Sequence, residues 1–186
     1  MVASDKEGNY VLEVMPSVTG WFHLPDAFLF RLINHIQKTN AISGHLLEIG
    51  VFQGKSFGLL STFRREGEIV FGFDLFAGQA SLEESLQTVE RATGSTEGVK
   101  LVTANSLTIP DSEVRTIVDG PVRFLHIDGG HDYGEALSDM RKFVPLVREG
   151  GSLRSMTTMT RTFQAFPWRQ PISPVSLSWC PLCLGI

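Results

Sequence analysis

The sequence lacks a long apolar run and lacks a large excess of charge of either sign. It contains no stretch of about eighteen apolar residues, which excludes an ordinary membrane-spanning helix. Its 16 basic and 20 acidic residues give a net charge of −4, so nothing favours nucleic acid or an anionic membrane surface as a partner. Near the start, Asp5, Lys6 and Glu7 interrupt any signal-peptide pattern.

Cysteine is also scarce, since Cys180 and Cys183 are the only two. A reduced, cytoplasmic protein is therefore the default expectation. The two residues form one C-x-x-C, but no second pair accompanies them, and we assign them no metal or redox role. With 186 residues, of which 42% are hydrophobic, the chain is long enough for one domain with a buried core.

What the sequence does contain is a regular alternation of strand and helix patterns after residue 44. Short apolar runs predict strands at 45–49, 68–73, 99–104 and 122–127. Amphipathic segments predict helices at 55–63, 81–91, 110–118 and 133–147. This order predicts an α/β fold of the Rossmann-like, doubly wound type, with a mostly parallel sheet and helices on both faces.

Three regions of the chain differ in composition. Residues 1–43 form an N-terminal segment that could cover a substrate, residues 44–151 form the core, and residues 152–186 form an aberrant tail. Within the first region, residues 1–22 are expected to be irregular. A helix is expected after them, beginning near Pro25. Its predicted buried stripe consists of Phe28, Leu29, Leu32, Ile33 and Ile36.

Ligands of parallel sheets bind at the carboxyl ends of the strands, and the first predicted strand ends in a glycine loop, E-I-G-V-F-Q-G-K-S. A Walker phosphate loop would need glycine at Ile49, and a dinucleotide loop would need glycine at Phe52. S-adenosylmethionine has no phosphate and tolerates a bulky residue there. The spacing therefore favours S-adenosylmethionine, with a merely structural turn as the alternative. The residues of this end that we expect to bind it are Glu48, Gly50, Phe52, Gly54 and Ser56.

Polar residues also end the second and third predicted strands. Asp74 could accept hydrogen bonds from both ribose hydroxyls, or it could cap the following helix. Asn105 and Ser106 could bind an adenine edge, and a helix N-cap is an equally good interpretation.

The fourth predicted strand ends in Asp128, Gly129 and Gly130, with His131 next in the chain. Asp128 is placed where a reactive methyl group would lie, and the two glycines keep this turn open. His131 could act as a base or metal ligand, or it could form a structural hydrogen bond. His126 within the strand is expected to be a core histidine with its hydrogen bonds satisfied.

These motifs resemble the class I methyltransferase family that includes the macrocin-type sugar O-methyltransferases. The resemblance covers about residues 44–151, and its most specific part is the block I-D-G-G-H-D-Y with a helix and Gly-Gly after it. It implies S-adenosylmethionine as the methyl donor, held by Glu48, Gly50, Gly54 and Asp74. It also implies a divalent metal such as Mg²⁺ with Asp128 as first ligand, and His131 as the base that deprotonates a hydroxyl.

The resemblance breaks after Gly151. The family implies a fifth strand there that ends in an acidic pair, but residues 152–186 contain no Asp, Glu or Lys. Met156-Thr157 and Met159-Thr160 suggest a cause, because in another reading frame each ATG-ACN pair contains the aspartate codon GAC. We therefore hypothesise a shifted frame. Its expected consequences are an incomplete metal site, an exposed edge at the fourth strand and weak activity.

The expected function is thus methyl transfer from S-adenosylmethionine to a small hydroxylated acceptor, such as a sugar or natural-product intermediate. The alternative is a remnant that binds the donor or a protein partner without turnover. Nucleotide hydrolysis and dinucleotide oxidoreduction are disfavoured by the loop spacing. Trp21, Phe22 and His23 could line the acceptor pocket or only pack a helix, and the formation of a homo-oligomer stays open.

Overall fold

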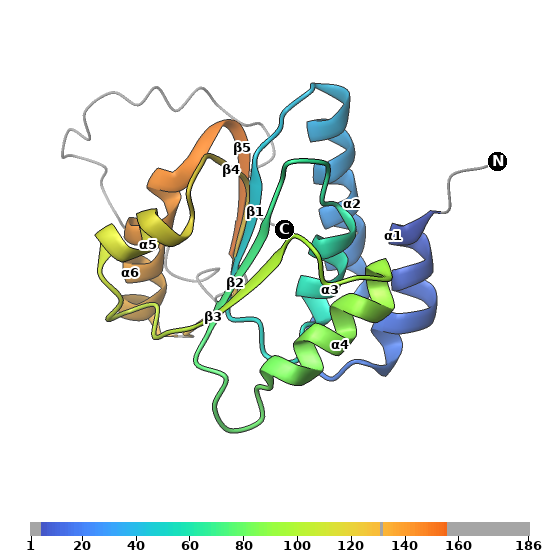
Figure 1. The fold of residues 1–186 in the computed structure, drawn as a ribbon, viewed down its shortest axis with the longest axis horizontal. Helices are drawn as coiled ribbons and strands as arrows, with labels where there is room; N and C mark the ends of the chain where they lie inside the picture. Colours follow the sequence, from blue (N-terminus) through green and yellow to red (C-terminus); the bar gives the residue numbers. More distant parts are fainter. Residues whose placement is uncertain (1–4, 131, 156–186) are drawn as a thin grey trace.

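A five-stranded, wholly parallel sheet forms the centre of the computed structural model, which describes residues 5–130 and 132–155 (Figure 1). Its strands are β1 (His45–Ile49), β2 (Val70–Asp74), β3 (Val99–Thr103), β4 (Val122–Ile127) and β5 (Val147–Ser155). They lie in the order β3-β2-β1-β4-β5. The chain therefore moves one way from β1 and then returns to its other side, so that a switch point lies between β1 and β4. The predicted Rossmann-like α/β fold is confirmed.

Helices cover both faces of this sheet (Figure 1). One face carries α1 (Lys6–Asn9), α2 (Leu24–Thr39), α3 (Lys55–Thr62) and α4 (Leu82–Thr93), and the other carries α5 (Asp111–Ile117) and α6 (Tyr133–Phe143). Side chains alternate between two cores along each strand, with Leu46 and Phe124 in one and Leu47 and Leu125 in the other. Within the described residues, no helix has the length and apolar character needed to cross a bilayer.

The N-terminal segment is more ordered than predicted. After α1 it continues as a π-helical turn, Tyr10–Val14, and a 3₁₀ turn, Met15–Ser17, so the expectation of irregular structure here was wrong. The buried Tyr10 hydroxyl donates to the carbonyl of Lys55 at 2.6 Å, and its ring lies against Gly58. Tertiary packing of this kind stabilises short helical turns that have little stability alone.

Helix α2 buries a different face from the predicted one. Its buried residues are Ala27, Phe30, Asn34 and Gln37, whereas Phe28 is 61% exposed. Selecting only apolar residues gave the wrong face, because two of the buried positions carry amide side chains. Asn34 and Gln37 face inward because they bind a buried arginine.

That arginine is Arg123 of β4, whose side chain is fully buried at the amino end of the sheet. Its guanidinium donates from Nε and Nη2 to the two carboxylate oxygens of Glu68, at 2.8 and 2.9 Å. The remaining N–H groups reach the side-chain oxygens of Asn34 and Gln37 and the carbonyl of Phe63, at 3.2, 2.7 and 2.8 Å. All five donors of the guanidinium are therefore used.

Glu68 is equally well satisfied. Its two oxygens also accept from the backbone N–H groups of Gly44 and Arg65, each at 3.0 Å. Burial alone would raise the pKa of Glu68, but the hydrogen bond and charge of Arg123 and the two N–H groups outweigh it and lower the pKa. Glu68 and Arg123 thus join the loop before β1, the end of α3 and the start of β4.

The fourth strand is not an exposed edge, which corrects the expectation for this region. β5 pairs with β4 in parallel, with Leu125 opposite Leu153 and Ile127 opposite Ser155. Sheet pairing uses backbone groups, so a polar sequence does not prevent it when its side chains find partners. Arg154 forms an ion pair with Asp26 at 2.8 Å. Met156-Thr157, Met159-Thr160 and both cysteines lie outside the described residues.

Candidate active site

A cleft of about 700 Å³ opens at the carboxyl ends of β1 to β4. Seven of the residues predicted to bind the donor or to act in catalysis line it: Gly50, Phe52, Ser56, Asp74, Asn105, Ser106 and Asp128. Glu48 is fully buried and Gly54 is the N-cap of α3; neither is among the residues that line the cleft. His131 lies outside the described residues. The cleft also has a wall from the N-terminal segment, formed by Thr19, Gly20, Trp21 and Phe22.

The glycine loop after β1 approaches the loop after β4 too closely for a side chain. Gly50 has a φ of 87°, and a Cβ on it would overlap the carbonyl oxygen of Asp128. The Asp128 N–H donates to the carbonyl of Ile49 at 2.7 Å, which fixes this approach. The loop ends at Gly54, whose left-handed backbone (φ 83°) starts α3. Glycine is required at Gly50 because of both space and conformation.

Asp74 at the end of β2 holds the glycine loop in place. Its Oδ2 accepts from the N–H groups of Val51 and Phe52, at 2.7 and 2.8 Å, and its Oδ1 accepts from Phe76 at 2.8 Å. A carboxylate has about four lone-pair directions, so one direction on Oδ1 is left for a ligand hydroxyl. Asp74 does not cap a helix, which was the alternative prediction. Its carboxylate instead accepts hydrogen bonds from its own loop and from the loop after β1.

Phe52 has an unusual backbone, and its ring forms part of the cleft wall. Its φ of 55° lies in the left-handed region, which costs a non-glycine residue on the order of 1 kcal/mol. The N–H bond to Asp74 offsets this strain. The ring contacts Trp21, with ring centroids 5.8 Å apart, and Trp21 itself is 75% exposed. Two aromatic rings therefore stand at the mouth of the cleft.

A buried polar group lies directly behind the loop. The Ser56 hydroxyl donates to Oε1 of Glu48 at 2.5 Å, and Nδ1 of His126 lies 3.3 Å from the same oxygen. Within the described residues, Glu48 Oε2 and both ring nitrogens of His126 have no partner in hydrogen-bond geometry. His126 is a core residue as predicted, but its hydrogen bonds are not satisfied. Burial and the Glu48 charge raise the pKa of the nearby Tyr10 hydroxyl.

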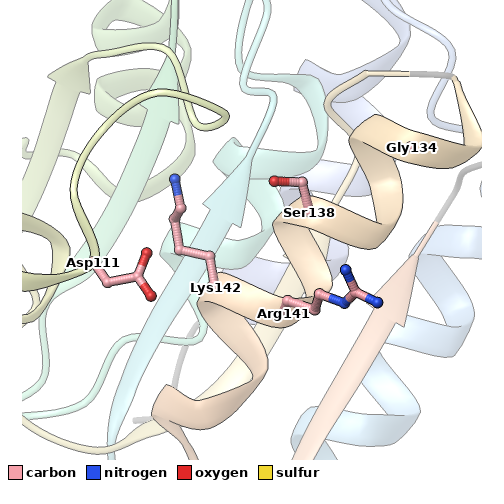
Figure 2. Close-up of a pocket in the computed structure, with 5 residues that line it drawn as sticks. All are labelled: Asp111, Gly134, Ser138, Arg141 and Lys142. Carbon is pink, nitrogen blue, oxygen red and sulfur yellow. The ribbon is translucent and has the colours of Figure 1, made fainter.

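Helix α6 holds the loop after β3 in place. Asn105 Oδ1 accepts from the N–H of Leu107 at 2.9 Å and so stabilises a turn rather than a helix N-cap, because α5 begins only at Asp111. Lys142 of α6 donates to the carbonyls of Ser106 and Ile109, at 2.5 and 2.7 Å. Figure 2 shows the Lys142 side chain rising beside Asp111, in a second hollow of about 220 Å³.

Several carboxyl groups gather near the Gly129-Gly130 turn. Asp128 and Glu135 line the cleft, and the Glu135 carboxylate occupies the space that a Cβ on Gly130 would take. Asp139 of α6 is fully buried behind Gly129, and its carboxyl oxygens make no hydrogen bond in ideal geometry with a described residue. Burial raises the pKa of Asp139, although Ser106 and the Lys142 ammonium oppose this change.

The arrangement of a glycine loop, a carboxylate after β2 and a carboxylate after β4 can now be compared with known proteins. The profile of a protein family described as "Methyltransferase domain" matches residues 47–154, which is more than half of the chain. The chain belongs to this methyltransferase family. The resemblance of the sequence to class I methyltransferases is thereby confirmed, and the matched region contains every strand of the sheet except the first two residues of β1 and the last of β5.

Solved structures support the fold of the methyltransferase. A Staphylococcus aureus protein named as a caffeoyl-CoA O-methyltransferase has a TM-score of 0.58 at 16% identity, over 87% of this chain and 70% of that one. An O-methyltransferase from Bacillus cereus, solved with S-adenosylhomocysteine, has a TM-score of 0.56 at 19% identity, over 80% and 64%. CalS11, a TDP-rhamnose 3'-O-methyltransferase, has a TM-score of 0.56 at 12% identity, over 81% and 69%. A comparison with curated proteins finds no match.

The described residues of the methyltransferase do not by themselves fit a metal ion. Among residues 5–130 and 132–155, no three His, Cys, Asp or Glu side chains are grouped closely enough to hold one. Asp128, the predicted first metal ligand, lies in the cleft without two such neighbours in this part of the chain. We therefore derive no chemical step through Mg²⁺.

Sequence reasoning missed three residues of the methyltransferase cleft and its surroundings. Lys55, Glu135 and Asp139 were not selected, although each is a charged residue in an amphipathic helix next to a selected loop. The signal for Asp139 was its position in the helix, since it lies between Ala136 and Phe143 on the face that α6 buries. A charged residue on that face indicates either a paired structural group or a part of the site.

Proposed function

We propose that this methyltransferase binds S-adenosylmethionine in the cleft and transfers its methyl group to a hydroxyl of a small molecule. The observation that supports this most directly is the contact between Gly50 and Asp128 beside Asp74, because it brings the glycine loop and two carboxylates together in one open cleft at the switch point of the sheet. The volume of about 700 Å³ lies within the usual range of roughly 300–1,000 Å³ for small-molecule sites.

In this proposal the ribose lies at Asp74, whose Oδ1 accepts a hydroxyl, and the adenine lies between Leu75 and the turn at Asn105 and Ser106. The exposed side chain of Leu75 supplies an apolar surface for the base. Phe52 covers the glycine loop, and Gly50 and Gly54 let the backbone approach the donor. Glu48 lies behind the loop and accepts the hydrogen bond of the Ser56 hydroxyl.

Bound S-adenosylmethionine supplies a methyl group on a positively charged sulfur. The acceptor oxygen forms a bond to the methyl carbon while the carbon–sulfur bond breaks, and the electron pair of that bond stays on sulfur. The protein contributes alignment of the two reactants and a group that takes the hydroxyl proton. Asp128 and Glu135 are the carboxylates in the cleft that can take it, and His131 is a further candidate from the sequence.

The acceptor enters from the side of the N-terminal segment in this proposal. Residues 1–43 provide Thr19 to Phe22 as one wall, residues 44–151 provide the donor site, and Trp21 presents an exposed aromatic face to the acceptor. Sugars and flat natural-product rings both pack well against such a face. The acceptor is therefore a small hydroxylated molecule with at least one apolar face.

A thermal shift experiment tests the donor site. S-adenosylhomocysteine should raise the melting temperature of the purified chain, whereas ATP and NAD should leave it unchanged, because only a ligand of the folded state stabilises it. Transfer of a labelled methyl group to hydroxylated acceptors, with and without Mg²⁺, then tests activity. Binding without transfer would favour the non-catalytic remnant, and stabilisation by ATP or NAD in place of S-adenosylhomocysteine would refute the proposed donor.

A further inference from the structure

Lys55 is a cation in the cleft whose charge the proposed function has not used. It is the first residue of α3, its side chain is partly buried, and its ammonium donates to the carbonyl of Gly20 at 3.1 Å. Among the described residues that line the cleft it is the one basic side chain, beside the acidic Asp74, Asp128 and Glu135. Within the described part of the chain, no carboxylate forms an ion pair with it.

An ammonium group of this kind has capacity for a ligand. It carries three N–H donors, and the carbonyl of Gly20 takes one of them, so two remain. A partly buried charge without a counter-charge is unfavourable, and an anionic ligand that accepts hydrogen bonds from it forms a strong, charge-assisted contact. The chemistry of Lys55 therefore favours a carboxylate.

The order of the strands places this cation relative to the rest of the donor. Asn105 follows β3, Asp74 ends β2, Lys55 follows β1 and Asp128 follows β4, and the strands lie side by side in that order. With adenosine over β2 and β3, the remaining part of S-adenosylmethionine must extend over β1 toward β4. That part is the amino-acid end, which carries a carboxylate.

We infer that Lys55 binds the methionine carboxylate of the donor, an inference that rests on the proposed function. The bond from Lys55 to Gly20 then has a second consequence, because the same ammonium contacts both the donor and the wall formed by the N-terminal segment. Lys55 joins recognition of the amino-acid end to the position of Trp21, the residue that follows Gly20.

Two ligands that differ only at the amino-acid end test this inference. S-adenosylhomocysteine has the carboxylate, whereas 5'-methylthioadenosine has the same adenosine and thioether without it. In Lys55→Gln the amide can still donate to the carbonyl of Gly20, but the charge is lost. Calorimetry should show S-adenosylhomocysteine binding roughly ten- to a hundredfold more weakly, with 5'-methylthioadenosine binding changed less than about twofold.

Lys38→Gln is the matched control, since it removes the same charge from the exposed end of α2 and should leave both affinities unchanged. Lys55→Arg should retain most of the affinity for S-adenosylhomocysteine. If Lys55→Gln weakens both ligands equally, or neither, the inference is overturned while the donor site stands. If the unaltered chain does not bind S-adenosylhomocysteine at all, the proposed function fails, and the inference with it.

Discussion

The buried charged groups at the two ends of the central sheet differ in how fully their hydrogen bonds and charges are satisfied. At the amino end, Arg123 and Glu68 are almost fully buried, and every donor and acceptor on them has a partner. At the carboxyl end, one oxygen of Glu48 is buried without a donor in hydrogen-bond geometry among the described residues, burial of Asp139 outweighs the effect of Ser106 and Lys142 on its pKa, and Lys55 lacks a counter-ion there.

This difference separates groups that stabilise the fold from groups that lie at the proposed donor site. A satisfied network is costly to disturb and cannot accept anything new, so the amino end is structural. Unsatisfied groups lower stability, and at the carboxyl end they lie at or behind the cleft in which we propose that the donor binds. Substitutions at the amino end should therefore change stability alone, and substitutions at the carboxyl end should change binding more.

The largest effect is expected for Arg123→Met. It leaves Glu68 buried and unpaired, so the free energy of unfolding should fall by about 3–5 kcal/mol. Because the pKa of Glu68 is lowered in the folded protein, its contribution is present at neutral pH and is lost as the pH falls through that pKa. Denaturant unfolding between about pH 7 and about pH 3 should show a smaller loss on acidification in the variant than in the parent.

Glu68→Gln is the milder companion of this variant, since the amide still accepts hydrogen bonds. The double variant with Arg123→Met should be less destabilised than the sum of the two single changes. Molecules that remain folded should bind S-adenosylhomocysteine with the parent's affinity. A specific loss of binding in either single variant would contradict the division between the two ends.

Gly50→Ala should give the next largest effect, and on binding first. The new methyl group overlaps the carbonyl of Asp128, and the φ of 87° is unfavourable for alanine. We expect S-adenosylhomocysteine binding to weaken more than about a hundredfold and stability to fall by about 2 kcal/mol. Gly94→Ala is matched to it, with a φ of 83° and open space around the added atom, and should lose stability without losing binding.

Asp74→Asn should weaken binding roughly ten- to a hundredfold in calorimetry. The amide presents N–H groups toward the donors of Val51, Phe52 or Phe76, so the glycine loop loses its anchor. Because both test ligands contain the ribose, S-adenosylhomocysteine and 5'-methylthioadenosine should weaken together, unlike in Lys55→Gln. Asp119→Asn, on the exposed loop before β4, is the control, and equal effects in the two variants would argue against a role at the site.

Asp139→Asn should have the smallest effect and the opposite sign. Burial raises the pKa of Asp139, so the folded parent loses stability as the pH rises from the ordinary value of 3.8 to the raised one. Asparagine has no such dependence, so above this range the variant should be more stable than the parent. Thermal unfolding against pH measures this gain, which should vanish in acid. A variant that is less stable at every pH would mean that the carboxylate has a stabilising partner.

The sheet and most of the cleft lining were predictable because they depend on the order of the strands and on the residues directly after each strand. Alternating apolar runs predicted β1 to β4, and parallel strands bring Gly50, Asp74, Asn105 and Asp128 to one edge. Such predictions use only local pattern and the geometry of parallel sheets. They need no knowledge of which side chains meet.

Predictions failed where a tertiary partner decided the outcome. The buried face of α2 was assigned to apolar residues, but Arg123 draws Asn34 and Gln37 inward. A single arginine inside the apolar strand 122–127 was the available signal. The fourth strand was expected to have an exposed edge, but β5 occupies it, and there Gln37 contacts Ser152 and Arg154 pairs with Asp26.

The position of β1 in the middle of the sheet also has a consequence for how the chain folds. His45 lies opposite Val122, so β1 acquires its second neighbour only after the three helices and two strands between them have been made. Within the described sheet, no pair of neighbouring strands is a hairpin, and each pairing requires a long loop to close before its contacts form. We expect the chain to fold slowly. It should be most vulnerable after β1 has paired with β2 and before the other edge of β1 has paired with β4.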